Sequence, residues 1–271
     1  MREKAIYFCL INSFICWFLF LIICLSDVTN WKLDSNNLKA EINDIYKTIK
    51  VNEKEETDKT VIVNQDTTLP KSNPYWDYIK MNLIDVDLNK LKEANPDTRG
   101  WIQVNGTNIN YPFVQSIDND YYLNHTFNRT INQAGWVFLD YRNDINNLAK
   151  NNILYAHGRL DKTMFGSLKN IFRNDWLNDQ NNYVVKISTE KENTLWQVFS
   201  VYIIPTTNDY IKINFDSNYE FNEWANALKN RSNYNFNTEI NELDKVLTLS
   251  TCYNELEKVV LHAKLIKIEE K

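Results

Sequence analysis

One cysteine, Cys252, stands apart from the other three in this chain of 271 residues. It ends a run, Lys245 to Cys252, whose apolar residues and threonines have the pattern of a β-strand. A thiol without a partner cannot close an intramolecular disulfide, and the thiolate form of cysteine is a strong nucleophile. The position of Cys252 therefore predicts nucleophilic chemistry at the end of a strand.

A cysteine nucleophile needs a base, because a free thiol with a pKa near about 8.5 is mostly protonated at neutral pH. The usual partner is an imidazole, and the sequence offers His125, His157 and His262. His157 follows an apolar run and precedes Gly158, so it is expected to project into a site from the mouth of a strand. His262 lies inside the last predicted strand, where packing or exposure explains it, and His125 lies among polar loop residues. We therefore predict His157 as the catalytic partner.

The other three cysteines, Cys9, Cys16 and Cys24, all lie in an almost wholly apolar stretch, 5–25. This stretch is long enough to cross a bilayer as a helix, so its cysteines are poor partners for Cys252. It carries no charge and lacks the small-residue cleavage site of a signal peptide. We therefore predict a retained, single-pass membrane anchor.

The charges before this anchor predict its orientation. Arg2 and Lys4 precede it, partly offset by Glu3. Because positive residues favour the cytoplasmic side, we expect residues 1–4 in the cytoplasm and the rest of the chain outside the cell membrane. A cleaved signal peptide is the alternative, although its apolar region is typically only about 7–15 residues long.

Composition narrows the classes of partner and fold. A net charge of −5 gives no electrostatic reason to expect nucleic-acid binding, which relies on clustered Lys and Arg. With so few cysteines outside the anchor, an exported domain must be held by its core, for which 13% aromatic residues supply material. We expect one globular domain and no nucleic-acid partner.

Two segments separate the anchor from the region expected to fold. Leu38, Ile42, Ile45 and Ile49 recur at helical spacing, which predicts an amphipathic helix, either a solvated spacer or a pairing surface. The segment 51–73 is polar and poor in aromatic residues, which predicts a flexible linker. We therefore expect a helical and polar stalk over 26–73 and the folded domain over 74–271.

The folded region is predicted to be mostly β with peripheral helices. Asp87 is expected to cap a short helix that ends before Pro96, and Asn105-Gly106 to form a tight hairpin turn. Strands are predicted over 101–104, 107–114, 135–139, 152–156, 183–187, 195–204, 245–250 and 258–268, and helices over 164–172 and 219–231. This pattern favours a mostly antiparallel barrel with a few helices packed on it.

Several stretches resemble one enzyme family, the sortases. Thr-Leu-Ser-Thr-Cys at 248–252 is similar to the sortase signature, in which Thr-Leu-x-Thr-Cys ends a barrel strand with the nucleophile. Stretches that resemble class B sortases in particular occur in the expected order, from about Leu88 to the C-terminus, at 91–97, 100–102, 108–115, 119–125, 138–143, 155–157 and 163–166. The resemblance implies a closed barrel of about eight strands, preceded by N-terminal helices.

The resemblance also implies an activity, cysteine transpeptidation at a Gram-positive cell surface. Cys252 would attack the Thr carbonyl of an Asn-Pro-x-Thr-like sorting motif near the C-terminus of a secreted protein, and His157 would protonate the leaving amine. An amine on a peptidoglycan precursor or a pilin would then resolve the thioacyl enzyme. Because an amine acceptor conserves the acyl bond energy, no metal, ATP or other cofactor is expected.

The third functional residue of the family is where this sequence departs from the pattern. An arginine is expected at the start of the strand after the cysteine, and the matching position holds Lys258, after a connection shorter than expected. Lysine supplies positive charge but not a planar, two-pronged donor. Three interpretations stay open: Lys258 acts in an altered site, Arg159 replaces the arginine, or the chain is a poor enzyme.

Two further residues of the signature are candidates for substrate binding, together with Arg159. Ser250 shares a strand face with Cys252 and is expected to contact substrate, whereas Thr251 points the other way and is expected to serve mainly through backbone and packing.

Three other functions compete with wall anchoring. A pilin-polymerising sortase differs only in the acceptor amine. A non-catalytic module that binds sorting peptides is supported only by Lys258. A papain-like protease is disfavoured, because its cysteine lies near a helix N-terminus and ahead of its histidine.

Overall fold

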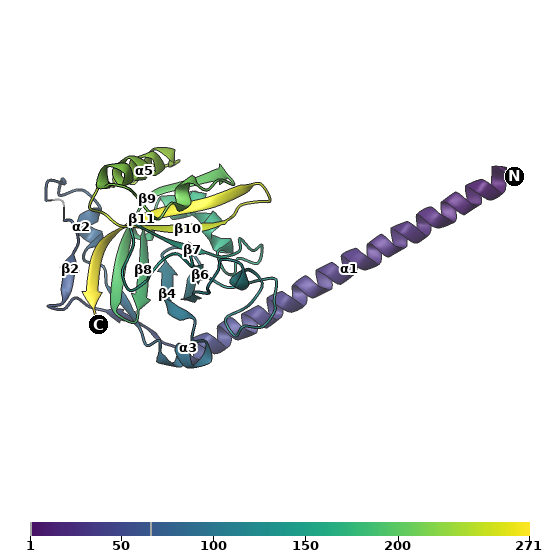
Figure 1. The fold of residues 1–271 in the computed structure, drawn as a ribbon, viewed down its shortest axis with the longest axis horizontal. Coiled ribbons are helices and arrows are strands. Elements are labelled where there is room, and N and C mark those ends of the chain that lie inside the picture. Colours follow the sequence, from purple (N-terminus) through teal and green to yellow (C-terminus); the bar gives the residue numbers. More distant parts are fainter. Residues whose placement is uncertain (1, 66) are drawn as a thin grey trace.

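The computed structural model describes residues 2–65 and 67–271, with a β-barrel at one end and a single long helix projecting from it (Figure 1). Eight strands close the barrel in the order β10-β7-β6-β5-β4-β8-β9-β11, and β11 pairs back with β10. Their bounds are β4 Thr98–Val104, β5 Asn110–Val114, β6 Phe138–Leu139, β7 Asn151–Tyr155, β8 Val184–Thr189, β9 Glu192–Pro205, β10 Val246–Cys252 and β11 Glu257–Glu270. The predicted closed, mostly antiparallel barrel is confirmed.

Two of the pairings in the barrel are parallel, β5 with β6 and β7 with β10. The second of these matters for function, because parallel strands end at the same edge of a sheet. Tyr155, the last residue of β7, pairs with Ser250 of β10. The residues that follow this pair, 156–157 on one chain segment and 251–252 on the other, therefore emerge together.

Glycine residues explain two of the turns. Gly106 has a φ of +70° in the predicted hairpin between β4 and β5, a backbone conformation that suits glycine. The strand predicted over 135–139 is shorter in the structure, where only Phe138–Leu139 pair. Gly135 has a φ of +60°, and a Cβ there would lie 2.5 Å from the carbonyl oxygen of Tyr122, so this residue makes a close turn instead of extending the strand.

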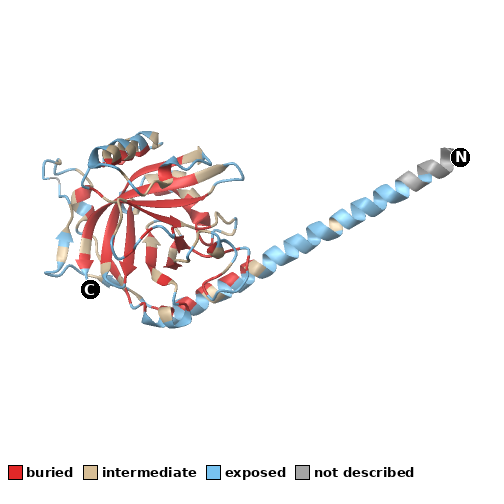
Figure 2. Ribbon diagram, in the orientation of Figure 1, coloured by how far each residue is buried: buried red, intermediate tan, exposed pale blue. Residues whose placement is uncertain are grey.

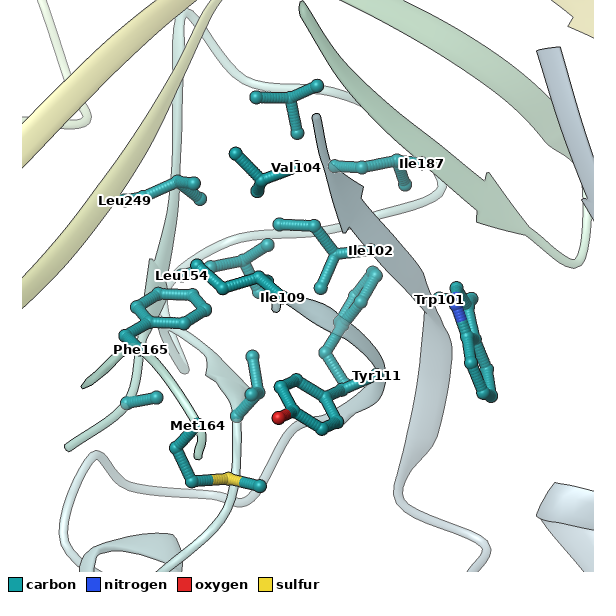
Figure 3. Close-up of a cluster of buried hydrophobic side chains, with 14 of the residues drawn as sticks. Trp101, Ile102, Val104, Ile109, Tyr111, Leu154, Met164, Phe165, Ile187 and Leu249 are labelled. Atoms are coloured by element: carbon teal, nitrogen blue, oxygen red, sulfur yellow. The ribbon is translucent and has the colours of Figure 1, made fainter. Parts of the chain in front are cut away.

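The barrel interior is filled by apolar side chains from opposite walls. Ile102 of β4, Leu154 of β7 and Leu249 of β10 meet there with Phe165, as Figure 3 shows. Because side chains alternate along a strand, burial of Leu247 and Leu249 in this core turns Ser250 and Cys252 toward the outside of the barrel.

Helices cover parts of the outer surface. The helix α5, Asn218–Arg231, lies over one face of the barrel (Figure 1), where Phe221 and Leu228 pack with Phe199 and Val260. Ser217 accepts a hydrogen bond from the backbone N–H of Glu220 and so caps this helix. The remaining short helices are α2 Tyr75–Tyr78, α3 Asn89–Ala94, α4 Asn174–Leu177 and the 3₁₀ turns η1 Tyr121–Leu123, η2 Gly166–Phe172, η3 Gln180–Asn182 and η4 Asp209–Ile211. The helix predicted over 164–172 is thus a 3₁₀ helix.

The long helix α1 runs from Arg2 to Thr48 without a break, so the predicted anchor and the predicted amphipathic helix are one element. It is the one helix among the described residues that is long and apolar enough to cross a membrane, and no residue of its most apolar window is buried (Figure 2). Its other end packs on the barrel, where Leu38 is 0% and Ile42 7% exposed. The prediction of a solvated spacer is therefore wrong, because the apolar face of this helix is covered by the domain.

Two parts of the segment 51–73 also belong to the fold, whereas residue 66 lies outside the described residues. Strand β1, Val51–Lys54, pairs with β3, Leu83–Val86, and strand β2, Thr60–Ile62, adds to the outer edge of β11. The prediction of a flexible linker is wrong here. It rests on polar composition, but edge strands bury few side chains and can therefore be polar.

Candidate active site

Cys252 is the last residue of β10 and its side chain is half-buried on the outside of the barrel. Its direct partner on β11 is Lys258. The Lys258 ammonium donates a hydrogen bond to the Cys252 sulfur over 3.0 Å. The sulfur and a positive charge are therefore in direct contact at the end of β10.

His157 follows β7 and is brought beside Cys252 by the parallel pairing of β7 and β10. The Thr251 hydroxyl donates to the carbonyl oxygen of Ala156 over 2.7 Å. These residues directly precede Cys252 and His157 in the chain. Gly158 lies so close to β10 that a Cβ on it would be 2.1 Å from the carbonyl oxygen of Cys252. The segment that carries His157 is therefore in contact with the nucleophile's own backbone.

The imidazole of His157 is oriented by a main-chain carbonyl. Its Nε2 lies 2.7 Å from the carbonyl oxygen of Leu123, the last residue of η1. Since a carbonyl oxygen only accepts, Nε2 carries the proton in the neutral ring and Nδ1 is left to take up or release one. This arrangement suits a group that exchanges a proton during catalysis. Leu123 gave no sign of this role in the sequence, because its contribution is a backbone oxygen.

Arg159, the alternative source of positive charge, is committed elsewhere. Its guanidinium donates to Asp161 and Thr163 in its own loop and to Ser35 of α1, and its side chain is 7% exposed. Burial raises the pKa of Asp161, but the hydrogen bonds from Arg159 and Thr163 outweigh it and lower that pKa to about 2. Arg159 therefore belongs to an ion pair in its loop, and Lys258 is the cation that the structure places on the sulfur.

The two other predicted substrate-binding residues are buried. Ser250 is 4% exposed, and its hydroxyl is within 3.0 Å of the Tyr210 hydroxyl. Thr251 is 3% exposed and bound to Ala156, as expected for a packing residue. Ser250 is therefore bound to Tyr210, a buried residue that sequence reasoning missed because no local motif marks it.

A hollow of about 640 Å³ opens beside Tyr210. It is lined by polar, charged, aromatic and aliphatic side chains from three connections, namely Asn119, Tyr141, Arg142, Asn208, Asp209, Ile211, Lys212 and Trp224. Asp209 and Ile211 are the chain neighbours of Tyr210, whose hydroxyl contacts Ser250 on the strand of the nucleophile.

A buried carboxylate organises the other side of this hollow. Asp140 accepts two hydrogen bonds from Arg142, at 2.8 and 2.7 Å, and others from Tyr155 and Asn119. Burial acts to raise the pKa of Asp140, but the hydrogen bonds from Arg142 outweigh it and the net shift is downward. Asp140 is therefore a fixed anion that orients the cationic lining. No cluster of His, Cys, Asp and Glu in the part of the chain that the structure describes could hold a metal ion.

Comparison with known proteins agrees with this geometry. The family model of the sortase domain matches residues 102–266, more than half of the chain. Sortase B of Staphylococcus aureus is 34% identical over 182 residues, which cover 66% of this chain and 74% of that protein. Sortase B of Listeria monocytogenes is 33% identical over 184 residues, with coverage of 66% and 74%.

Solved structures show the same relationship. The crystal structure of sortase B from Bacillus anthracis in complex with AAEK1 matches with a TM-score of 0.67 and 30% identity, covering 89% of this chain and 99% of that one. Clostridium perfringens sortase B matches with a TM-score of 0.62 and 32% identity, covering 66% and 100%. One strand of the barrel ends in Cys252 beside His157, and the relatives share 30% identity or more. The chain therefore belongs to the sortase family of cysteine transpeptidases, and within it to class B.

Proposed function

We propose that this protein is a membrane-anchored transpeptidase that cleaves the C-terminal sorting motif of secreted proteins and joins them to a cell-wall precursor. The observation that carries the proposal is the contact of 3.0 Å between the Lys258 ammonium and the Cys252 sulfur, at the strand end where His157 also lies. A thiol, a proton-transfer group and a fixed positive charge at one place are what acyl transfer through a thioester requires.

The reaction follows from these three groups. The Cys252 thiolate attacks the Thr carbonyl carbon of the motif, and the C–N bond breaks as His157 gives its proton to the leaving amine. The thioester that remains is attacked by the acceptor amine, from which His157 takes a proton while the C–S bond breaks and the thiolate returns. Lys258 stabilises the negative charge on sulfur before the first step and after the second.

The hollow beside Tyr210 is the place where we expect the sorting peptide to bind. Its wall includes Asn119, Arg142 and Lys212, which offer donors to peptide carbonyls, and Tyr141 and Trp224, which offer apolar faces. Because Tyr210 contacts Ser250, two residues before the nucleophile, a peptide lying there would run toward Cys252. An Asn-Pro-x-Thr-like motif is the class B expectation.

The helix α1 supports the membrane part of the proposal. Its exposed apolar half would span the bilayer once, with residues 1–4 in the cytoplasm and the barrel outside. The acceptor is then an amine that reaches the outer membrane surface, such as that of a peptidoglycan precursor.

Intact-mass analysis of the full chain in detergent tests the proposal. The protein is incubated with Asn-Pro-x-Thr and Leu-Pro-x-Thr peptides, with Cys252→Ala as the control. We expect a thioacyl adduct that requires Cys252 and that disappears when an amine acceptor is added. If no peptide gives an adduct, the transpeptidase assignment for this chain is overturned in favour of a module that only binds peptides.

A further inference from the structure

The end of α1 nearest the barrel touches both segments that orient His157. The first segment is the loop 158–166, which follows His157 directly. The second is the connection 121–136, which includes Leu123, the acceptor of the His157 hydrogen bond. Neither segment is close to α1 in the sequence.

The loop after His157 is compact and is fixed to α1 by Arg159. Within the loop, the backbone N–H of Phe165 donates to the carbonyl of His157 over 3.1 Å, and Gly158 bridges to Met164. Arg159 reaches out of the loop, donating to the hydroxyl of Ser35, which is 3% exposed. The same guanidinium lies over the ring of Trp31, 5.8 Å from its centroid.

The connection that carries Leu123 is held by the same stretch of helix. Asn132 donates to the carbonyl of Asp34 over 3.0 Å, and the backbone N–H of Gln133 donates to the Asp34 carboxylate over 3.3 Å. About two turns further on, the Glu41 carboxylate accepts from the backbone N–H of Asn128 over 2.6 Å. The helix therefore contacts this connection at three points.

We propose that residues 31–41 of α1 position His157 for catalysis, so that the membrane helix is a structural part of the active site. Trp31 and Ser35 are the positioning residues, and they act through Arg159. The inference rests on the proposed transpeptidase function for its catalytic consequence, but the contact between helix and loop can be measured without substrate.

With the proposed anchoring, this contact also fixes how far the barrel lies from the membrane. The apolar stretch ends at about Leu25, and Trp31 lies six positions further along the helix, a rise of about 9 Å. Because the helix is continuous and docked, the barrel is held close to the membrane surface instead of swinging on a linker.

The test compares the full chain in detergent with Trp31→Ala/Ser35→Ala. Trp31→Phe keeps a ring under the guanidinium and is the conservative variant. The matched control is Leu33→Ala, on the same helix stretch but 58% exposed. Hydrogen exchange of the loop 158–166 is measured first, and in the double variant we expect its amides to exchange about tenfold faster, since local opening sets their rate. Leu33→Ala should exchange as the wild type.

Two peptide substrates then separate positioning from general damage. One is the amide peptide, and the other carries a phenyl thioester at the Thr carbonyl, whose leaving group needs no proton from His157. A displaced His157 should lower the rate of thioacylation by the amide about tenfold or more and leave the thioester rate nearly unchanged. Trp31→Phe, which keeps an aromatic ring at this position, should thioacylate with the amide at nearly the wild-type rate. Loss of folding would lower both rates together.

Each result decides the proposal. Unchanged exchange in the double variant would show that α1 does not hold the loop, and an unchanged ratio of the amide rate to the thioester rate would show that the contact does not position His157. If the wild type reacts with neither substrate, the proposed function fails, while the exchange data still decide the contact between helix and loop.

Discussion

Lys258 faces Cys252 directly across the β10–β11 hairpin, with its nitrogen 3.0 Å from the sulfur. The short connection makes this pairing possible. Tyr253 and Glu257 are joined by a backbone hydrogen bond of 2.8 Å, and the Asn254 side chain accepts from the N–H groups of Leu256 and Glu257. Because the turn is tight, the residue at position 258 reaches the sulfur with a flexible side chain and a compact charge, where the family pattern has an arginine.

Lys258→Gln is expected to lower the rate of thioacylation about 100-fold, because it removes the charge that stabilises the thiolate. Lys258→Arg should fall between this variant and the wild type, since it keeps the charge but not the compact shape of the ammonium. The measurement is the rate of adduct formation by intact mass. The control is Lys229→Gln, which removes a lysine of α5 that is paired with Glu239. Equal rates for Lys258→Gln and the wild type would show that Lys258 is only a neighbour of the sulfur.

Gly158→Ala is expected to separate His157 from the nucleophile. The new Cβ would lie 2.1 Å from the carbonyl oxygen of Cys252, so the loop or the strand must shift. A misplacement of about 1 Å can cost about 100-fold in rate. We expect that loss in thioacylation, with little change in the circular dichroism spectrum. A variant that reacts at the wild-type rate would mean that the loop accommodates the methyl group without moving His157.

His262 is a buried neutral histidine and predicts a pH dependence of stability. It is 0% exposed and bonded to the hydroxyls of Tyr202 and Thr248. Burial, reinforced by the charge of Arg231, lowers its pKa from 6.5 to about 3. The unfolded chain therefore binds a proton at this residue below about pH 6.5 and the folded chain does not until about pH 3, so stability falls as the pH drops through that window.

Denaturant unfolding at pH 7 and pH 5 measures this effect. The wild type should lose about 2 kcal/mol through His262 over this interval. His262→Gln should lack this part of the loss, whatever its stability at pH 7. The same loss in both proteins would assign the pH dependence to other groups.

Local patterns in the sequence predicted the strands and the positions of Cys252 and His157, because alternation, turn residues and a signature are all local. The parallel pairing of β7 with β10 was not predictable in this way, since it joins residues almost 100 positions apart. Tyr210 and Leu123 were missed for the same reason. One acts through a hydroxyl in a loop without a motif, and the other through a carbonyl that every residue has.

The N-terminal region shows a different limit. The spacing of Leu38 and Ile42 correctly predicted an apolar helix face, but it could not say what covers that face. The polar composition of 51–73 predicted disorder, although the segment supplies two edge strands and Glu56, whose carboxylate lies 2.9 Å from the fully buried Lys267 ammonium. Composition reports side chains, whereas edge strands are held largely by backbone hydrogen bonds.

A chain that begins at Pro74 is therefore expected to be much less stable than one that begins at Ser26. It loses the docked face of Leu38, Ile42, Ile45 and Ile49, at about 1.5–3 kcal/mol for each fully buried side chain. It also loses Glu56 and both edge strands. Since a typical domain is stable by only about 5–15 kcal/mol, this deletion removes much of the total. Thermal melts of the two chains, with the full chain as control, measure the difference. The chain from Ser26 should melt with the full chain, and a chain from Pro74 that melted within a few degrees of both would show that α1 contributes little to holding the barrel.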